Sequence, residues 1–237
     1  MTNGRPRRSQ HSAGGGPNSK AHKRHKSQNA GSGVPSARKQ LRAAGASLND
    51  ERRFEAAEDA LEHGRVPEAK KWLRPLRAKF EDVAAIRELW GIIAYHDQEW
   101  ELAEDELATG FVLTGSPIHH AVRMDIARAR RDYLAVDRLW RELKDKPTRT
   151  DVMVEARIVR ASALADQGNL DEALEFAMKG PKRPDRIRDH HIRLWYTLGD
   201  LEERSGNLPQ ARRWFKKVAQ FDRDSYDARE RLADLGT

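Results

Sequence analysis

The residue types in this sequence that could do chemistry are a glycine-rich stretch before a lysine, two histidine pairs and many carboxylates. A phosphate-binding loop needs a set spacing from glycine to lysine after a strand, and the stretch from Gly14 begins too close to Lys20. Neighbours on a helix point about 100° apart, so the adjacent pairs His119-His120 and His190-His191 do not converge on a metal. We expect no metal and no cofactor.

Catalytic arrangements are equally poorly supported. His22 and His25 stand among four cations that would repel a metal ion. Glu88 and Asp97 are of the types used in acid–base catalysis, but carboxylates on amphipathic helices form solvated faces far more often. With no cysteine, the chain has no thiol nucleophile, thiolate zinc site or disulfide. The sequence therefore predicts that the chain is not an enzyme.

The residues from Trp195 to Phe215 are instead arranged for packing. Two amphipathic helices are expected on either side of a turn at Gly206-Asn207. Gly199 and Ala211 are small enough to let the two backbones approach, and Phe215 fills the space between this pair and the next. Because one helix pair cannot bury its own apolar face, the pattern predicts further copies stacked beside it.

The turn-then-alanine signature recurs along the chain. The alanines are separated by 34, 32, 38 and 38 residues, and they are Ala69, Ala103, Ala135, Ala173 and Ala211. The residue four positions after each alanine is apolar, as one face of a helix requires; these residues are Leu73, Leu107, Leu139, Ala177 and Phe215. Five copies in phase predict an array of helical hairpins.

This unit resembles the tetratricopeptide repeat, which has Trp, two residues, Leu-Gly, two residues and Tyr on its first helix, then Ala, three residues and Phe on its second. Trp195, Leu198-Gly199, Ala211 and Phe215 match, whereas Glu202 stands where Tyr is usual. The resemblance implies an all-α, right-handed solenoid of about five helix pairs plus a C-terminal capping helix. The pairs are expected near residues 50–82, 84–115, 117–147, 151–180 and 190–222, and the capping helix at 225–236.

Basic charge is concentrated at the N-terminus. The first 49 residues hold ten of the 44 Lys and Arg residues and no Asp or Glu, so the remainder has 34 basic and 37 acidic residues. Residues 1–46 are poor in apolar side chains and are expected to form a disordered basic tail, followed by a helical repeat domain at 47–237. Basic residues of the tail and outer helices are candidates for nucleic-acid binding: Arg7, Arg8, Lys20, Lys23, Arg24, Lys26, Lys182, Arg183, Arg212, Arg213, Lys216 and Lys217.

The resemblance to tetratricopeptide repeats also implies a concave groove, lined by the first helix of each pair, that binds a protein or peptide. Mapping the groove-facing positions onto this sequence gives Glu51, Phe54, Glu58, Glu62, Glu88, Ile92, Tyr95, His96, His120, Met124, Glu155, Ile158, Tyr196, Asp200 and Glu203. Chaperone-binding members hold a C-terminal carboxylate with Lys and Asn, which these positions lack. Acidic and aromatic residues favour a basic or amphipathic partner instead. The chain's own segment 20–26 is one such candidate, because an arm of about 40 residues reaches on the order of 35 Å.

Two functions follow as predictions: a non-catalytic scaffold that binds proteins in this groove, or an RNA- or ribosome-associated accessory protein that uses the basic tail and outer helices. The longest apolar run, Leu89–Tyr95, has seven residues, whereas a membrane span needs about 18. No hydrophobic signal region follows the N-terminus. We therefore expect a cytoplasmic protein without a membrane partner, and the Ala, Arg and Asp content is typical of a GC-rich bacterial genome.

Overall fold

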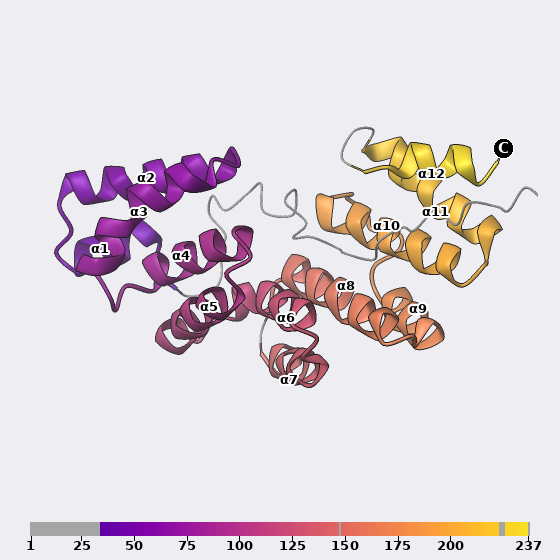
Figure 1. Ribbon diagram of the computed structural model, residues 1–237, viewed down its shortest axis with the longest axis horizontal. Helices are drawn as coiled ribbons and strands as arrows, with labels where there is room; N and C mark the ends of the chain where they lie inside the picture. Colours follow the sequence, from indigo (N-terminus) through magenta and orange to yellow (C-terminus); the bar gives the residue numbers. More distant parts are fainter. Residues whose placement is uncertain (1–33, 147, 223–225, 237) are drawn as a thin grey trace, which may run out of the picture.

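The computed structural model describes residues 34–146, 148–222 and 226–236, and every regular element in these residues is a helix (Figure 1). Five hairpins follow one another: α2 (Leu48–Glu62) with α3 (Val66–Lys79), α4 (Ala84–His96) with α5 (Trp100–Thr114), α6 (His120–Ala129) with α7 (Tyr133–Lys144), α8 (Thr150–Asp166) with α9 (Leu170–Met178), and α10 (Asp189–Arg204) with α11 (Leu208–Phe221). A short helix lies at each end, α1 (Ala37–Ala43) and α12 (Ala228–Asp234), and the 3₁₀ turn η1 (Pro117–His119) leads into α6. The predicted all-α array of five helix pairs with a closing helix is confirmed. No helix in the described ranges is long and apolar enough to pass through a bilayer.

Each hairpin turns through one residue in the left-handed region of backbone conformation. These residues have φ between 59° and 88° and are Gly64, Gln98, Arg131, Gly168 and Gly206. Five positions later, a buried residue donates its N–H to the carbonyl of the residue that caps the second helix; these are Ala69, Ala103, Val136, Ala173 and Ala211. The shared turn therefore sets the register of every second helix.

The third hairpin departs from the predicted register by one residue. The sequence pattern placed its packing residues at Ala135 and Leu139, and both are buried in the core. The turn nevertheless puts Val136 and Trp140 in the positions equivalent to those of the other hairpins. The error arose because Arg131, not a glycine, holds the left-handed conformation there, so the turn carried no residue-type signal. One residue rotates a helical position by about 100°, which changes the side chains that face each neighbour.

Small residues on first helices allow close packing against second helices. A Cβ added to Gly91 would lie 2.7 Å from Leu107 Cγ, and one added to Gly199 would lie 2.7 Å from Phe215 Cε1. Such contacts are too short for a side chain, so the helices of these two hairpins are as close as only glycine permits. Both large partners are almost completely buried.

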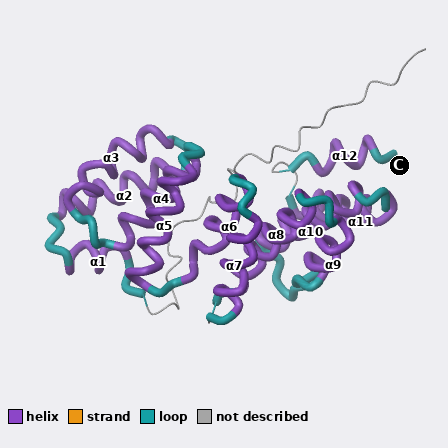
Figure 2. Tube along the Cα trace, turned by 60° about the horizontal axis from the view of Figure 1, so that its bottom comes forward, coloured by secondary structure: helices purple, strands orange, loops and turns teal. Residues whose placement is uncertain are grey.

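The hairpins stack along the long axis of the molecule and curve into an arc (Figures 1 and 2). First helices contact first helices in the C-terminal half, α6 with α8 and α8 with α10. The second helices α3, α5 and α7 each pack against the first helix of the next pair. Figure 1 shows α5, α7 and α9 along the outer side of the arc, with α4, α8 and α10 closer to its inner side.

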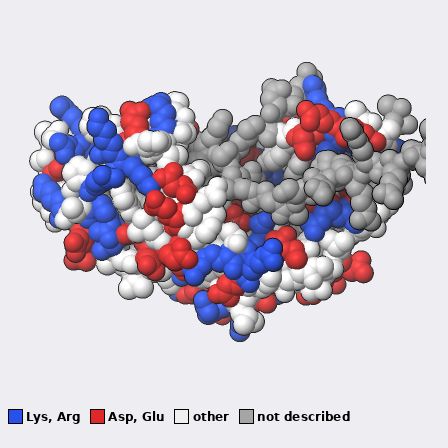
Figure 3. Space-filling model, viewed as in Figure 1, with Lys and Arg blue, Asp and Glu red and all other residues white. Residues whose placement is uncertain are grey.

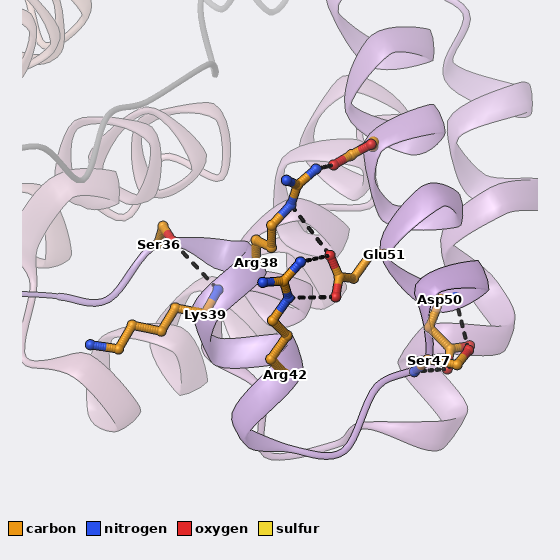
Figure 4. A network of polar contacts seen from close by, with 8 residues as sticks. Ser36, Arg38, Lys39, Arg42, Ser47, Asp50 and Glu51 are labelled. Atoms are coloured by element: carbon orange, nitrogen blue, oxygen red, sulfur yellow. Dashed lines mark hydrogen bonds and ion pairs between the residues drawn. The ribbon is translucent and has the colours of Figure 1, made fainter.

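The N-terminal part of the folded region begins earlier than predicted. Residues 37–43 form α1 instead of belonging to a disordered tail, because Leu41 is buried and Ser36 caps the helix by accepting from the Lys39 N–H. Arg42 donates to Glu51 of α2 at 2.7 and 3.1 Å, and Figure 4 shows Arg38 beside the same carboxylate. The predicted disorder of residues 1–33, with the candidates Arg7 to Lys26, lies outside the described residues.

Candidate protein-binding face

The inner side of the arc is held together by polar contacts between successive first helices. The Tyr95 hydroxyl on α4 donates to Asp125 on α6 at 2.6 Å. Arg128 Nε on α6 donates to Asp166 on α8 at 3.1 Å, and the same guanidinium also contacts Asp125 at 3.1 Å. These side chains therefore join three hairpins across their junctions.

Glu155 on α8 and Arg193 on α10 form the next contact along the inner face, 2.7 Å apart. The two side chains are 21% and 15% exposed, so most of their hydration is lost. Burial raises the pKa of Glu155 to about 7, with Asp151 adding to the rise and Arg193 opposing it. Burial and the neighbouring carboxylates therefore oppose ionisation of Glu155, and the contact with Arg193 favours it.

The closing helix α12 covers the last part of the inner face. Its Arg231 lies 2.9 Å from Asp200 and 2.7 Å from Glu203, both on α10. The Tyr196 hydroxyl donates to Asp227 at 2.6 Å and accepts from Arg231 at 3.2 Å. The three candidates that the sequence pattern placed on α10 are therefore brought together, and their charge is largely neutralised by α12.

Many of the predicted groove residues are almost completely buried, so they offer a partner little side-chain surface. Each is at most 6% exposed: Glu51, Phe54, Glu88, Ile92, Tyr95, His120 and Met124. A first helix is covered by its own second helix and by the neighbouring pairs, and Glu51 in the first pair is covered by Arg42 of α1. Only a narrow stripe of each first helix remains available. In the third hairpin the cause is the register, because a shift of one residue puts Ala121 and Asp125 where His120 and Met124 were expected.

The inner face is mixed in charge, which corrects the expectation of an acidic groove. Arginines that the groove pattern did not include, Arg128, Arg193 and Arg231, pair with its carboxylates. In Figure 3, Lys and Arg side chains lie interspersed with Asp and Glu over the region of α4 to α8. The remaining candidates are half-buried: Glu58, Glu62, His96 and Ile158.

The missed residues differ in whether the sequence carried a signal for them. Asp125 and Arg128 fall on groove positions once the register of α6 is moved by one residue. The sequence signal for this shift is Asp132, a residue type that favours the N-cap position. Its side chain caps α7 by accepting from the Ala135 N–H at 3.0 Å. Arg231 lies on the capping helix, where a pattern based on first helices could not find it.

Part of the predicted basic set gathers at the loop between α9 and α10. Lys217 Nζ on α11 donates to the Lys182 carbonyl at 2.6 Å and lies 3.7 Å from the Trp195 ring centroid. Burial lowers the pKa of Lys217, and Arg183 adds to the effect. The other candidates on α11 are separate from this loop: Arg213 contacts Gln210, Arg212 donates to the Leu235 carbonyl, and Lys216 is exposed.

The buried histidines belong to the packing of the hairpins. Burial lowers the pKa of His120 to about 4, and that of His190 to about 4. The rings of His190 and His191 lie 4.0 Å apart between centroids, tilted against one another. Across the described parts of the chain, no group of three His, Cys, Asp or Glu side chains is placed to hold a metal ion.

The chain is an α-helical repeat protein, because its helical hairpins repeat and the first helices of successive hairpins pack together into an arc. Two family models described as Tetratricopeptide repeat match it, one over residues 54–111, which lie within α2 to α5, and one over residues 154–177, within α8 and α9. These two parts of the chain are tetratricopeptide repeats, a kind of repeat that typically mediates protein–protein interactions. A comparison with curated proteins gave no significant match.

Proposed function

We propose that the chain is a non-catalytic scaffold that binds an amphipathic segment of a partner protein along the inner face of α4, α6, α8 and α10. The observation that carries the proposal is the series of contacts between first helices, from Tyr95 with Asp125 to Glu155 with Arg193. These contacts fix the spacing of the helices before any partner arrives. A surface ordered in advance loses little conformational entropy on binding, which favours affinity.

The chemistry of this face points to a partner with charges of both signs. Asp125, Arg128, Asp166 and Arg193 alternate in sign along it. Ile158 on α8 adds a half-buried apolar position among them. In such interfaces a few apolar anchors carry most of the affinity, and complementary charges select the partner and its register.

Site-specific photocrosslinking in cells tests which face binds the partner. Benzoylphenylalanine at His96 on α4 or at Ile158 on α8 should trap one and the same protein, because both are half-buried groove candidates on helices of the proposed face. Matched controls are Val112 and Leu134, which are 81% and 82% exposed on the outer helices α5 and α7. Equal trapping of that protein from the control positions would contradict the proposal.

RNA binding is the second candidate function, and the specific observation in its favour is the meeting of Lys182, Arg183 and Lys217 at one loop. Photocrosslinking from Lys182 distinguishes the two. Recovery of RNA there, with a salt-sensitive shift of single-stranded RNA by the full-length protein, would favour an RNA-associated role. No shift at low salt would remove it.

A further inference from the structure

A pocket of about 490 Å³ lies where α8 begins and α9 ends. Its polar lining comes from Lys146 and Thr148 of the loop before α8, from Thr150 and Arg157 of α8, and from Lys179 after α9. None of the described residues that line it is acidic. Arg157 is two residues from Glu155 and therefore points about 200° away from it around the helix. The pocket is thus separate from the inner face.

Arg157 carries a charge that no carboxylate of the described residues neutralises. Its Nη1 donates to the Phe176 carbonyl at 3.0 Å. The guanidinium lies 5.4 Å from the Trp140 ring centroid and 5.0 Å from that of Phe176. Burial and the neighbouring Arg160 both act to lower the pKa of Arg157. A half-buried cation without an anionic partner costs stability, which favours a role in binding over one in packing.

Two residues that line the pocket differ from those at the equivalent positions of the last hairpin. Sixteen residues before the packing alanine, the last hairpin has Trp195 and this one has Arg157; seven residues after it, the last hairpin has Val218 and this one has Gly180. Trp195 and Val218 are fully buried in the last hairpin. At the same positions this hairpin has a half-buried arginine and a glycine that the Leu194 and Arg157 side chains closely approach.

Gly180 also holds the wall of the pocket close to the arginine. A Cβ at this position would lie 3.1 Å from Arg157 Cδ and 2.6 Å from Leu194 Cδ2. The chain after α9 therefore passes directly beside the Arg157 side chain and places Lys179 at the rim. Lys179 has one carboxylate partner, Glu175, at 2.9 Å, and both side chains are more than half exposed, so this pair contributes little neutralisation.

The start of α8 adds to the positive potential in the pocket. Thr150 is the first residue of this 17-residue helix and lines the pocket. The N-terminal end of a helix carries a partial positive charge. In the first turn of α8, the Asp151 carboxylate accepts from the Val152 N–H and pairs with Arg149. Lys146, Arg157 and Lys179 also line the pocket, so an anionic group placed here would lie near several positive charges.

We propose that this pocket binds a carboxylate side chain of an acidic segment from a partner protein. Met153, Val154 and Pro181 complete the lining and supply apolar contact for the methylene groups that carry such a carboxylate. A nucleic acid fits less well, because stacking on bases needs an accessible ring. The nearby rings of Trp140 and Phe176 already lie beneath Arg157 and Arg160.

Fluorescence anisotropy with the full-length protein tests this site. The probe is a short labelled peptide in which Glu alternates with Ala, and its matched control has Gln in place of Glu. Arg157→Gln should weaken binding of the Glu peptide by about tenfold, the range for a hydrogen bond to a charged group. Lys146→Glu should weaken it as well without disturbing Arg157, whereas Lys71→Glu on the outer helix α3 should leave it unchanged. Thermal unfolding of each variant shows whether the fold is retained.

Three results would overturn the proposal. One is equal binding by the wild-type protein and both pocket variants, which would place the peptide elsewhere, for instance on the basic N-terminal residues. The second is equal affinity for the Glu and Gln peptides. The third is displacement of the peptide by oligouridylate, together with weaker oligouridylate binding by the Arg157 and Lys146 variants. That result would show that the pocket binds RNA instead. The test uses neither the inner face nor its partner, so it succeeds or fails independently of the proposed scaffold function.

Discussion

The last two hairpins share a turn but fill the space between their helices differently. Gly168 and Gly206 hold the same left-handed conformation, at φ 88° and 80°. In the last hairpin Phe215 packs directly on Gly199. In the preceding hairpin the equivalent residues are Ala177 and Ala161, both fully buried. A helix–helix contact can be filled by one large side chain that faces a glycine, or by two small side chains that face each other. The last hairpin uses the first arrangement and the preceding hairpin uses the second.

The last two hairpins also differ in the length of their second helices. The second helix α11 has 14 residues, whereas α9 has only nine and leaves the beginning of the 17-residue α8 partly uncovered. The cationic pocket lies at this uncovered start. The comparison teaches that a repeat array can gain a local site where one hairpin is shortened, while the shared turn keeps the neighbouring hairpins in register.

The largest expected effect is the loss of the large side chain in the last hairpin. Phe215→Ala should lower the free energy of unfolding by about 3–5 kcal/mol, because it leaves a cavity in a fully buried contact. Ala177→Gly at the equivalent position removes one methyl group and should cost only about 1 kcal/mol through helix propensity. Urea unfolding followed by circular dichroism measures both. Similar losses at the two positions would mean that the hairpins do not differ in the way described.

The second effect is the clash at the glycine that faces Phe215. Gly199→Ala should destabilise the protein by about 1–3 kcal/mol, because the added Cβ would meet the ring at 2.7 Å. In the Phe215→Ala background the ring is gone, and the same change should become neutral or stabilising. The double-mutant cycle therefore gives a coupling energy. Additive effects would show that Gly199 is not required by the ring.

The fold could be predicted from the sequence largely because the hairpins repeat their packing residues. The register of four hairpins was predicted correctly, because a turn glycine or the alanine itself marks where the two helices of the hairpin come close together. These alanines are Ala69, Ala103, Ala173 and Ala211. The third hairpin was misplaced by one residue because its turn residue is Arg131 and its packing residue is Val136. Residue type alone did not reveal a conformation that the chain adopts through tertiary context.

The candidate site was predicted less well than the fold, for a physical reason. Groove positions were assigned by spacing on single helices, but exposure depends on which neighbours cover each face. Ile92 fits the groove spacing and yet is fully buried, and Asp200 is exposed less than expected because Arg231 of α12 lies on it. Contacts between hairpins are set by residues distant in sequence, and one sequence read in isolation does not specify them.

Substitutions in α8 and α9 can give this hairpin the packing arrangement of the last one. Ala177→Leu places a large side chain in α9 where only a small one fits, and it should cost about 1–3 kcal/mol through overpacking. Adding Ala161→Gly recreates the arrangement of Gly199 and Phe215 on these helices. The double variant should recover part of the loss despite the lower helix propensity of glycine. A double variant less stable than Ala177→Leu alone would show that helix spacing in α8 and α9 is fixed by other contacts.

The smallest effects concern the turns, where the two hairpins agree. Gly168→Ala and Gly206→Ala should each cost about 1 kcal/mol, because an L-residue is strained in the left-handed region. Arg131→Gly should act in the opposite direction and stabilise the protein by about 1 kcal/mol, since Arg131 holds the same conformation with a side chain at φ 59°. Urea unfolding of the three variants checks both signs. If Arg131→Gly instead destabilised the third hairpin, its side chain would be contributing contacts that outweigh the backbone strain, and the turn would no longer be interchangeable between hairpins.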